Sequence, residues 1–154
     1  TSMLLMKAPD KFHYGIAGGG VYDWAFYDTH YTERYMDTPQ NNPEGYAVAK
    51  VLNYVDGYPT EYTESVSVSI ASSSSPKGES ARIKVEPVML KLTHGTGDDN
   101  VHHQNTLQLL DAMHKAGKKF DFMIYPDGMH GYYGYQGEHF KQANRAFWLR
   151  YLCR

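Results

Sequence analysis

The sequence lacks the features that indicate a disulfide-rich fold, a membrane-spanning protein or a protein that binds polyanions. Its single cysteine, Cys153, excludes an internal disulfide and leaves the redox compartment open. No run of about 18 apolar residues is present, so the sequence predicts no membrane-spanning helix. The net charge is only −2, which gives no indication of a nucleic-acid or anionic membrane partner. A glycosylation sequon of the Asn-x-Ser/Thr type and a recognisable signal peptide are also missing.

What is present is the composition of an ordinary globular domain. With 154 residues, 42% of them hydrophobic and 21% charged, the chain is long enough for one domain with a real core. It opens with Thr1 rather than methionine, and residues 1–7 have the pattern of an apolar helix without an N-cap. We therefore expect the chain to be a segment of a longer protein.

The first half of the sequence predicts short elements followed by an insertion. Residues 14–17 form an apolar run before three glycines at 18–20, which is typical of a buried strand that ends in a loop. Residues 27–36 and 44–52 have helical character. From 54 to 84 Ser, Thr, Gly and charged residues dominate, so we expect a loosely ordered or disordered insertion there.

The second half alternates strands with helices. A buried strand is predicted at 87–92, a strand with alternating pattern at 119–125, and a helix from about 138 to 153 closes the chain. The inner face of this last helix is expected to comprise Phe140, Ala143, Asn144, Phe147, Trp148, Tyr151 and Leu152. The alternation indicates an α/β domain with a mostly parallel sheet, in which functional residues lie in the loops after the strands.

Between these two strands the sequence predicts a further helix that ends near Ala116, just before Gly117. Asp99 and Asn100 are expected to cap its start, because their side-chain oxygens can accept hydrogen bonds from free backbone N–H groups. Its buried face is expected to carry Leu107, Leu110 and His114.

Two of the loops that follow strands carry an acid and a histidine. The loop 94–100 contains Asp98, and the loop 126–131 contains His130. In α/β hydrolases the triad follows the chain as Ser, Asp and His, and the carboxylate orients an imidazole that deprotonates the serine. Taken singly, Asp98 reads as a helix cap and His130 as an ordinary loop histidine. Together, in this order, they favour a catalytic pair about as strongly as a structural one.

Three stretches then resemble the dipeptidyl peptidase IV subfamily of the prolyl oligopeptidase family of serine peptidases. Residues 94–102, with His94-Gly95-Thr96 followed by Asp98-Asp99-Asn100-Val101-His102, resemble its aspartate loop. Residues 127–131 resemble its histidine loop, and residues 27–36 resemble a further stretch typical of the subfamily. The resemblance covers residues 1–53 and 85–154.

The resemblance implies the C-terminal part of an α/β-hydrolase fold. It also implies a serine exopeptidase that removes dipeptides after a penultimate proline or alanine, without cofactor or metal. The nucleophilic serine, on an elbow about six residues before Thr1, and a β-propeller domain are expected to lie outside this chain, so the chain alone is expected to be inactive. Peptides are the implied substrates, and the complete protein is expected to be a homodimer that is membrane-anchored and extracellular, secreted or periplasmic.

Residue roles follow from the resemblance by position. Asp98 corresponds to the triad acid, Asp99 to a structural neighbour, His130 to the general base, and Asn100 to a side chain that binds a substrate backbone carbonyl. The residues that match the apolar and aromatic pocket for the second substrate residue are Val21, Trp24, Tyr27, Tyr31 and Val101. Without the resemblance, the aromatic members of this set read as a helix packing stripe.

The sequence also departs from the family pattern. The three glycines at 18–20 replace a more apolar segment that ends in Ala-Pro, and the segment 54–84 is longer and richer in serine than the expected connector. Cys153 occupies a disulfide position of some relatives, but Tyr14 stands where its partner is expected.

Two other classes of function compete with the peptidase hypothesis. A family relative that has lost its triad would serve as a protein-interaction subunit, although retention of Asp98 and His130 argues against it. A metal site that includes His102 is also conceivable among eight histidines, but no suitably spaced third ligand completes it.

Overall fold

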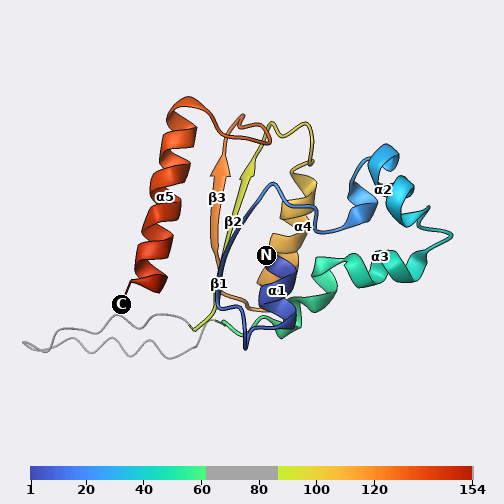
Figure 1. The fold of residues 1–154 in the computed structure, drawn as a ribbon, viewed down its shortest axis with the longest axis horizontal. Coiled ribbons are helices and arrows are strands. Elements are labelled where there is room, and N and C mark those ends of the chain that lie inside the picture. The colour runs from blue at the N-terminus through green and yellow to red at the C-terminus, as the bar shows by residue number, and fades with distance from the viewer. Residues whose placement is uncertain (62–86, 154) are drawn as a thin grey trace, which may run out of the picture.

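In the computed structural model, which describes residues 1–61 and 87–153, three parallel strands form a sheet between two helical layers (Figure 1). The strands are β1 (Tyr14–Gly18), β2 (Met89–Gly95) and β3 (Asp121–Tyr125), in that order across the sheet. Gly18 pairs with Thr93 in β2, and Thr93 pairs with Met123 in β3. All three strands therefore end at the same edge, and the predicted parallel α/β architecture is confirmed.

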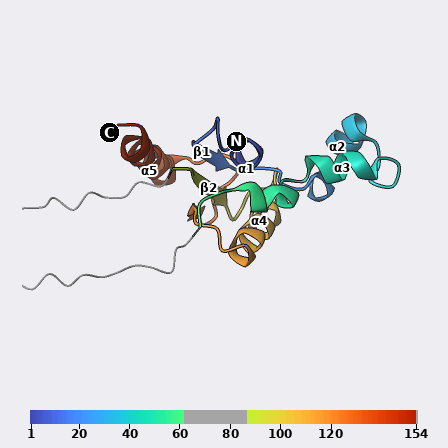
Figure 2. The same cartoon turned by 90° about the horizontal axis from the view of Figure 1, so that it is seen from below.

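The two faces of β2 pack against different helices. Leu90 and Leu92 lie in the larger core with α1 (Ser2–Lys7) and α4 (Gln104–Lys115). Met89 lies in a second core with Phe147 and Tyr151 of α5 (Gly134–Leu152). The view from below shows α5 on one side of the sheet and α4 on the other (Figure 2). This alternation follows from the two-residue period of a strand.

The start of α4 differs from the prediction. Its N-cap is His103, which makes no side-chain capping hydrogen bond, so Asp99 and Asn100 do not cap it. The buried residues of the helix are Asn105, Thr106, Leu109, Leu110 and Met113, whereas Leu107 and His114 are exposed. The predicted buried face was therefore wrong for Leu107 and His114. The true face includes the polar residues Asn105 and Thr106, which interrupt its apolar pattern.

The expected insertion begins later than the composition indicates. The helix α3 (Pro43–Ala49) ends early and a 3₁₀ helix, η2 (Val51–Gly57), follows it. Tyr58 is completely buried, and its hydroxyl accepts a hydrogen bond from the backbone of Leu90 in β2. Residues 54–61 therefore belong to the packed domain. The rest of the expected insertion, from 62 to 84, lies outside the described residues.

A small helical unit extends from the domain on the side away from α5 (Figures 1 and 2). It consists of a 3₁₀ turn, η1 (Trp24–Phe26), then α2 (Thr29–Met36) and α3. Asp23, Asp28 and Asn42 accept backbone hydrogen bonds at the three N-termini, which explains why each element begins where it does. Across residues 1–61 and 87–153, no helix combines the length and the apolar character needed to cross a bilayer.

Candidate functional site

Asp98 and His130 meet at the edge where the strands end. The loop after β2 carries Asp98 and the loop after β3 carries His130. Asp98 Oδ2 lies 3.0 Å from His130 Nδ1, which is the hydrogen-bond contact expected from the sequence. The Asp98 side chain is 1% exposed and the His130 side chain is 47% exposed. A buried acid thus orients an imidazole that solvent and a substrate can reach.

The loop after β2 holds the Asp98 carboxylate in its ionised form. Asp98 Oδ1 accepts hydrogen bonds from the backbone N–H groups of Asn100 at 3.0 Å and Val101 at 2.9 Å. Burial alone would raise the pKa of Asp98. The hydrogen bonds from His130, Val101 and Asn100, together with the charge on His130, outweigh burial and hold this pKa below its ordinary value.

Gly19 covers the pair from the end of β1. Its φ of 53° lies in the left-handed region, and its backbone N–H donates to the carbonyl of Thr93 at 3.1 Å. A Cβ at this position would lie 3.1 Å from the His130 ring and 3.4 Å from Asp98 Oδ2. The backbone at Gly19 therefore lies directly against the His130 ring, and only glycine fits at this position without displacing a neighbour.

Tyr132 ties the histidine loop to the sheet. Its hydroxyl donates to Thr93 Oγ1 at 3.3 Å, and its ring packs against Tyr125 of β3 with the centroids 4.2 Å apart. Burial raises the pKa of Tyr132, so this phenol stays protonated at neutral pH. Thr93 thus contacts both the Gly19 segment and the residue two positions after His130.

The predicted aromatic residues form one cluster beside the acid loop. Trp24 stacks on Tyr31 at 6.1 Å between centroids, and the edge of Tyr27 faces both rings at 5.7–5.9 Å. The Tyr27 hydroxyl donates to Asn100 Oδ1 at 2.8 Å, which joins the cluster to the loop of Asp98. The structure therefore brings Trp24, Tyr27, Tyr31 and Asn100 together.

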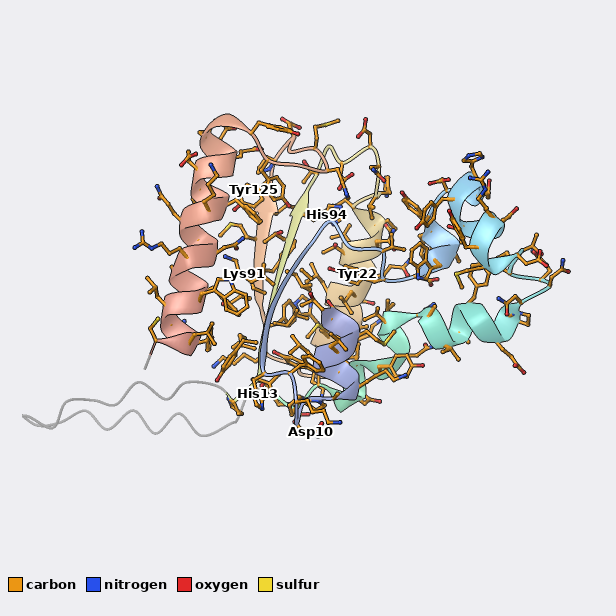
Figure 3. The ribbon with its side chains drawn as sticks, viewed as in Figure 1. Asp10, His13, Tyr22, Lys91, His94 and Tyr125 are labelled. Atoms are coloured by element: carbon orange, nitrogen blue, oxygen red, sulfur yellow. The ribbon has the colours of Figure 1, made fainter. Side chains whose placement is uncertain are left out.

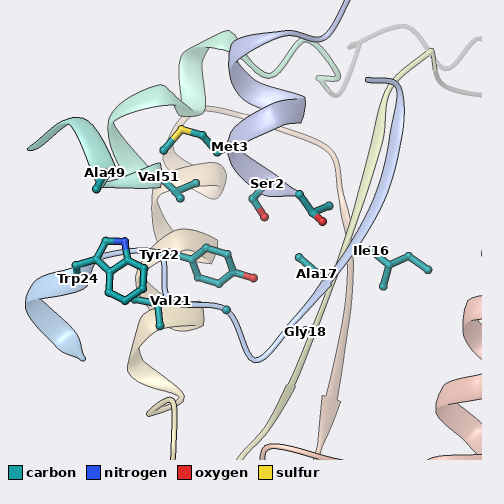
Figure 4. Close-up of a pocket in the computed structure, with 12 residues that line it drawn as sticks. Ser2, Met3, Ile16, Ala17, Gly18, Val21, Tyr22, Trp24, Ala49 and Val51 are labelled. Carbon is teal, nitrogen blue, oxygen red and sulfur yellow. The ribbon is translucent and has the colours of Figure 1, made fainter. Parts of the chain in front are cut away.

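The other two predicted pocket residues lie elsewhere in the same region. Val21 and Trp24 line an open pocket of about 550 Å³ between α1, β1 and η2, into which Tyr22 also points its hydroxyl (Figure 4). Val101 is buried beneath the acid loop, where its carbonyl accepts a hydrogen bond from His94. Val101 therefore supports the loop, and no described contact joins it to the aromatic cluster.

Sequence reasoning missed three residues that organise the site, namely His94, Thr93 and Tyr132. His94 lies near the end of β2 beside α4 and is completely buried (Figure 3). The motif containing His94 was noticed, but nothing in its pattern distinguishes a buried polar partner of Asp98 from a loop residue. Tyr132 could have been found only from its position two residues after His130.

His102, considered as a possible metal ligand, is exposed, and its Nδ1 accepts a hydrogen bond from the backbone of Gln104. In the part of the chain that the structure describes, no group of three or more His, Cys, Asp or Glu side chains is arranged to hold a metal ion.

The model of the prolyl oligopeptidase family matches residues 1–153. The chain belongs to the prolyl oligopeptidase family. It is 40% identical over 143 residues to the "Probable dipeptidyl-aminopeptidase B" of Uncinocarpus reesii, covering 92% of this chain and 13% of that relative. It is 38% identical over 148 residues to the protein of the same name from Coccidioides posadasii, covering 96% of this chain and 12% of that relative.

A solved structure agrees with the family assignment. Porphyromonas gingivalis dipeptidyl peptidase 4 superposes with a TM-score of 0.74 at 31% identity, and the match covers 96% of this chain and 17% of that one. The described parallel sheet and its flanking helices are those of an α/β-hydrolase fold. This member of the prolyl oligopeptidase family therefore spans about an eighth of the length of the curated relatives it matches.

Proposed function

We propose that the complete protein is a serine-type dipeptidyl peptidase in which Asp98 is the triad acid and His130 the general base. The observation that carries this proposal is the 3.0 Å contact between buried Asp98 and accessible His130. In this arrangement the ring nitrogen Nδ1 donates to the carboxylate, which leaves Nε2 as the basic nitrogen that removes a proton from a serine hydroxyl. The carboxylate then stabilises the imidazolium that forms during acyl transfer.

The serine itself is proposed to lie before Thr1. A parallel strand that precedes α1 and follows the usual right-handed crossover would pair with the free edge of β1. Its C-terminal turn would then reach the same edge of the sheet as Asp98 and His130. The chain described here is accordingly proposed to be inactive by itself. A β-propeller domain is proposed to complete the longer protein, as the resemblance implies.

The aromatic cluster supports a preference for proline or alanine as the second substrate residue. A flat proline ring gains apolar contact against the faces of Trp24 and Tyr31, and alanine fits the same space. Asn100 uses its side-chain oxygen to accept from Tyr27, so its NH₂ group is the part that can donate to a substrate carbonyl. The nearby Val21 supplies further apolar surface.

Turnover of a Gly-Pro amide substrate by the longer protein tests this proposal. Asp98→Asn should lower kcat by roughly 10⁴-fold, because the amide no longer fixes the tautomer or stabilises the imidazolium. Asp99→Asn is the matched control: Asp99 is exposed, and the change should cost no more than a few-fold.

Comparable losses of kcat in the two variants would show that Asp98 is wrongly assigned as the triad acid. An unmodified longer protein that cleaves no dipeptide, while remaining folded, would instead support the non-catalytic alternative, a protein-interaction subunit.

A homodimer of the complete protein is proposed to use β3 and α5. The edge strand β3 exposes Ile124 by 41%, and with α5 it borders an apolar groove of about 330 Å³. A second copy can cover this groove and satisfy the strand edge. Sedimentation equilibrium should show a dimer that Ile124→Asp converts to monomer, and an unchanged dimer would exclude this face.

A further inference from the structure

A second histidine contacts the acid from beneath. His94 is completely buried, and its Nε2 lies 2.8 Å from the carbonyl oxygen of Val101 and 3.2 Å from Asp98 Oδ2. Its Nδ1 faces the hydroxyl of Thr106 on α4. Both ring nitrogens therefore have polar partners inside the domain, and Asp98 Oδ2 lies between two imidazoles.

The partners of His94 determine which ring nitrogen carries the hydrogen. A backbone carbonyl only accepts, so the nitrogen that faces Val101 must be the donor. In the neutral ring, Nε2 then carries the hydrogen and Nδ1 accepts from the Thr106 hydroxyl. Asp98 Oδ2 lies 3.2 Å from the same Nε2, so the N–H group that donates to the Val101 carbonyl also lies beside the carboxylate.

We propose that His94 is a positioning residue that holds the Asp98 carboxylate in the orientation that His130 requires, an inference that rests on the proposed peptidase function. The backbone N–H groups of Asn100 and Val101 fix Oδ1. Among the described side chains, His130 is the one hydrogen-bonded to Oδ2, and it is 47% exposed. His94 fixes the second oxygen from the buried side, so the acid is preorganised before the exposed imidazole engages it.

The other side chains near Asp98 allow the contribution of His94 to be measured separately from theirs. The ring of His103 meets His94 edge-on at 5.1 Å between centroids but makes no hydrogen bond to Asp98. The phenol of Tyr132 is directed to Thr93. Apart from His130, His94 is thus the titratable side chain in direct polar contact with the carboxylate in the described structure.

The first test uses the unmodified chain. Nitrogen-15 NMR of the labelled histidines should show His94 with a hydrogen on Nε2 and none on Nδ1. The reverse tautomer would direct a lone pair at both the Val101 carbonyl and Asp98, and finding it would overturn the proposal. This measurement needs no catalytic activity, so it stands or falls independently of the peptidase assay.

The second test follows the carboxyl carbon of Asp98 by carbon-13 NMR during acid titration. His94→Leu should make Asp98 about tenfold weaker as an acid, because the charged form loses the polar N–H group that lies 3.2 Å from Oδ2. His94→Gln should return most of that acidity, since the glutamine amide N–H reaches the position of Nε2. His103→Phe is the matched control: it keeps an aromatic ring against His94 and removes only a charge that interacts with Asp98 at longer range, so its effect on the titration should be smaller than that of His94→Leu.

A His94→Leu chain that titrates like the unmodified one would refute the role. So would a His94→Gln chain that titrates like His94→Leu, because packing alone would then explain the residue. Should the leucine variant fail to fold, the tautomer of His94 in the unmodified chain and the titration of His94→Gln decide the question.

Discussion

Gly19 occupies a position where the site geometry disfavours any side chain. Its φ of 53° is costly for other residues, and a Cβ would press on the His130 ring. Gly117, just after α4, offers a comparison within the same chain. Its φ is 64°, but a Cβ there would meet nothing within 4 Å.

We predict that Gly19→Ala destabilises the chain more than Gly117→Ala and also disturbs the site. Each substitution should cost about 1 kcal/mol for the left-handed backbone alone. Gly19→Ala must additionally shift the His130 ring, by a few tenths of an ångström. Urea unfolding of both variants measures the first effect, and the NMR signal of the hydrogen on His130 Nδ1 reports the second. Equal stability losses and an unchanged His130 signal in both variants would contradict the prediction.

At the same scale, sequence reasoning selected the two residues that meet, Asp98 and His130, but not the residues that support them. Asp98 and His130 could be found because the order of chemical groups along the chain follows the order of strands, and parallel strands end at one edge. His94 could not, because its partners Val101 and Thr106 meet it only when the loop folds back over β2. Contacts of this kind depend on loop geometry, which no periodic pattern encodes.

The element β2 carries a lysine on the face that packs against α5. Lys91 is 6% exposed and lies between the sheet and α5, in register with Asp121 of β3 (Figure 3). Burial lowers the pKa of Lys91 from its ordinary value of 10.5, and the charge of Asp121 offsets only part of this effect. Keeping the ammonium charged in this place therefore costs stability at neutral pH.

We predict that Lys91→Met stabilises the chain by about 1 kcal/mol at pH 7, since methionine has a similar length and no charge to bury. The folded-state pKa of Lys91 lies below the unfolded-state value. The penalty is therefore fully present below the folded-state pKa and disappears as pH rises to 10.5. The advantage of the variant should shrink over that range in urea unfolding experiments.

Lys141→Met provides the control for this prediction. Lys141 is 72% exposed on α5, so its replacement should change stability by less than about 0.5 kcal/mol. A destabilised Lys91→Met chain would show that the ammonium makes a favourable contact. An advantage that does not depend on pH would show that the gain does not come from the buried charge.

The boundaries of the elements show where tertiary packing overrides the local preference of the sequence. The composition of residues 54–61 indicated a loop, yet Tyr58 fills the core and its hydroxyl bonds Leu90 in β2 and the carbonyl of Lys119 before β3. One buried aromatic residue with a polar tip thus orders a segment whose neighbours are mostly polar. In contrast, the long apolar face of α5 was predicted well, except for exposed Leu152.

At the scale of the whole molecule, the described residues that flank positions 62–86 lie against each other. The Thr60 hydroxyl donates to the carbonyl of Val88, and the Thr60 carbonyl accepts from Lys119 at 2.9 Å. Glu61 pairs with Lys118, whose side chain is 6% exposed. The domain therefore holds residues 60 and 88 together through its own contacts, and a short connection can join them.

We predict that replacing residues 62–86 by a Gly-Ser linker of about six residues leaves the domain folded and equally or slightly more stable. Each halving of a closed loop lowers its entropic cost by about 0.6 kcal/mol, so two halvings contribute about 1 kcal/mol. Urea unfolding followed by circular dichroism measures the change.

Thr60→Val, made in both the original and the shortened chain, is the control: it removes the same hydrogen bond to Val88 and should cost the same in each. A shortened chain that loses more than about 2 kcal/mol would mean that residues 62–86 contribute contacts to the domain. A larger cost of Thr60→Val in the shortened chain would mean instead that the linker strains the junction between Thr60 and Val88.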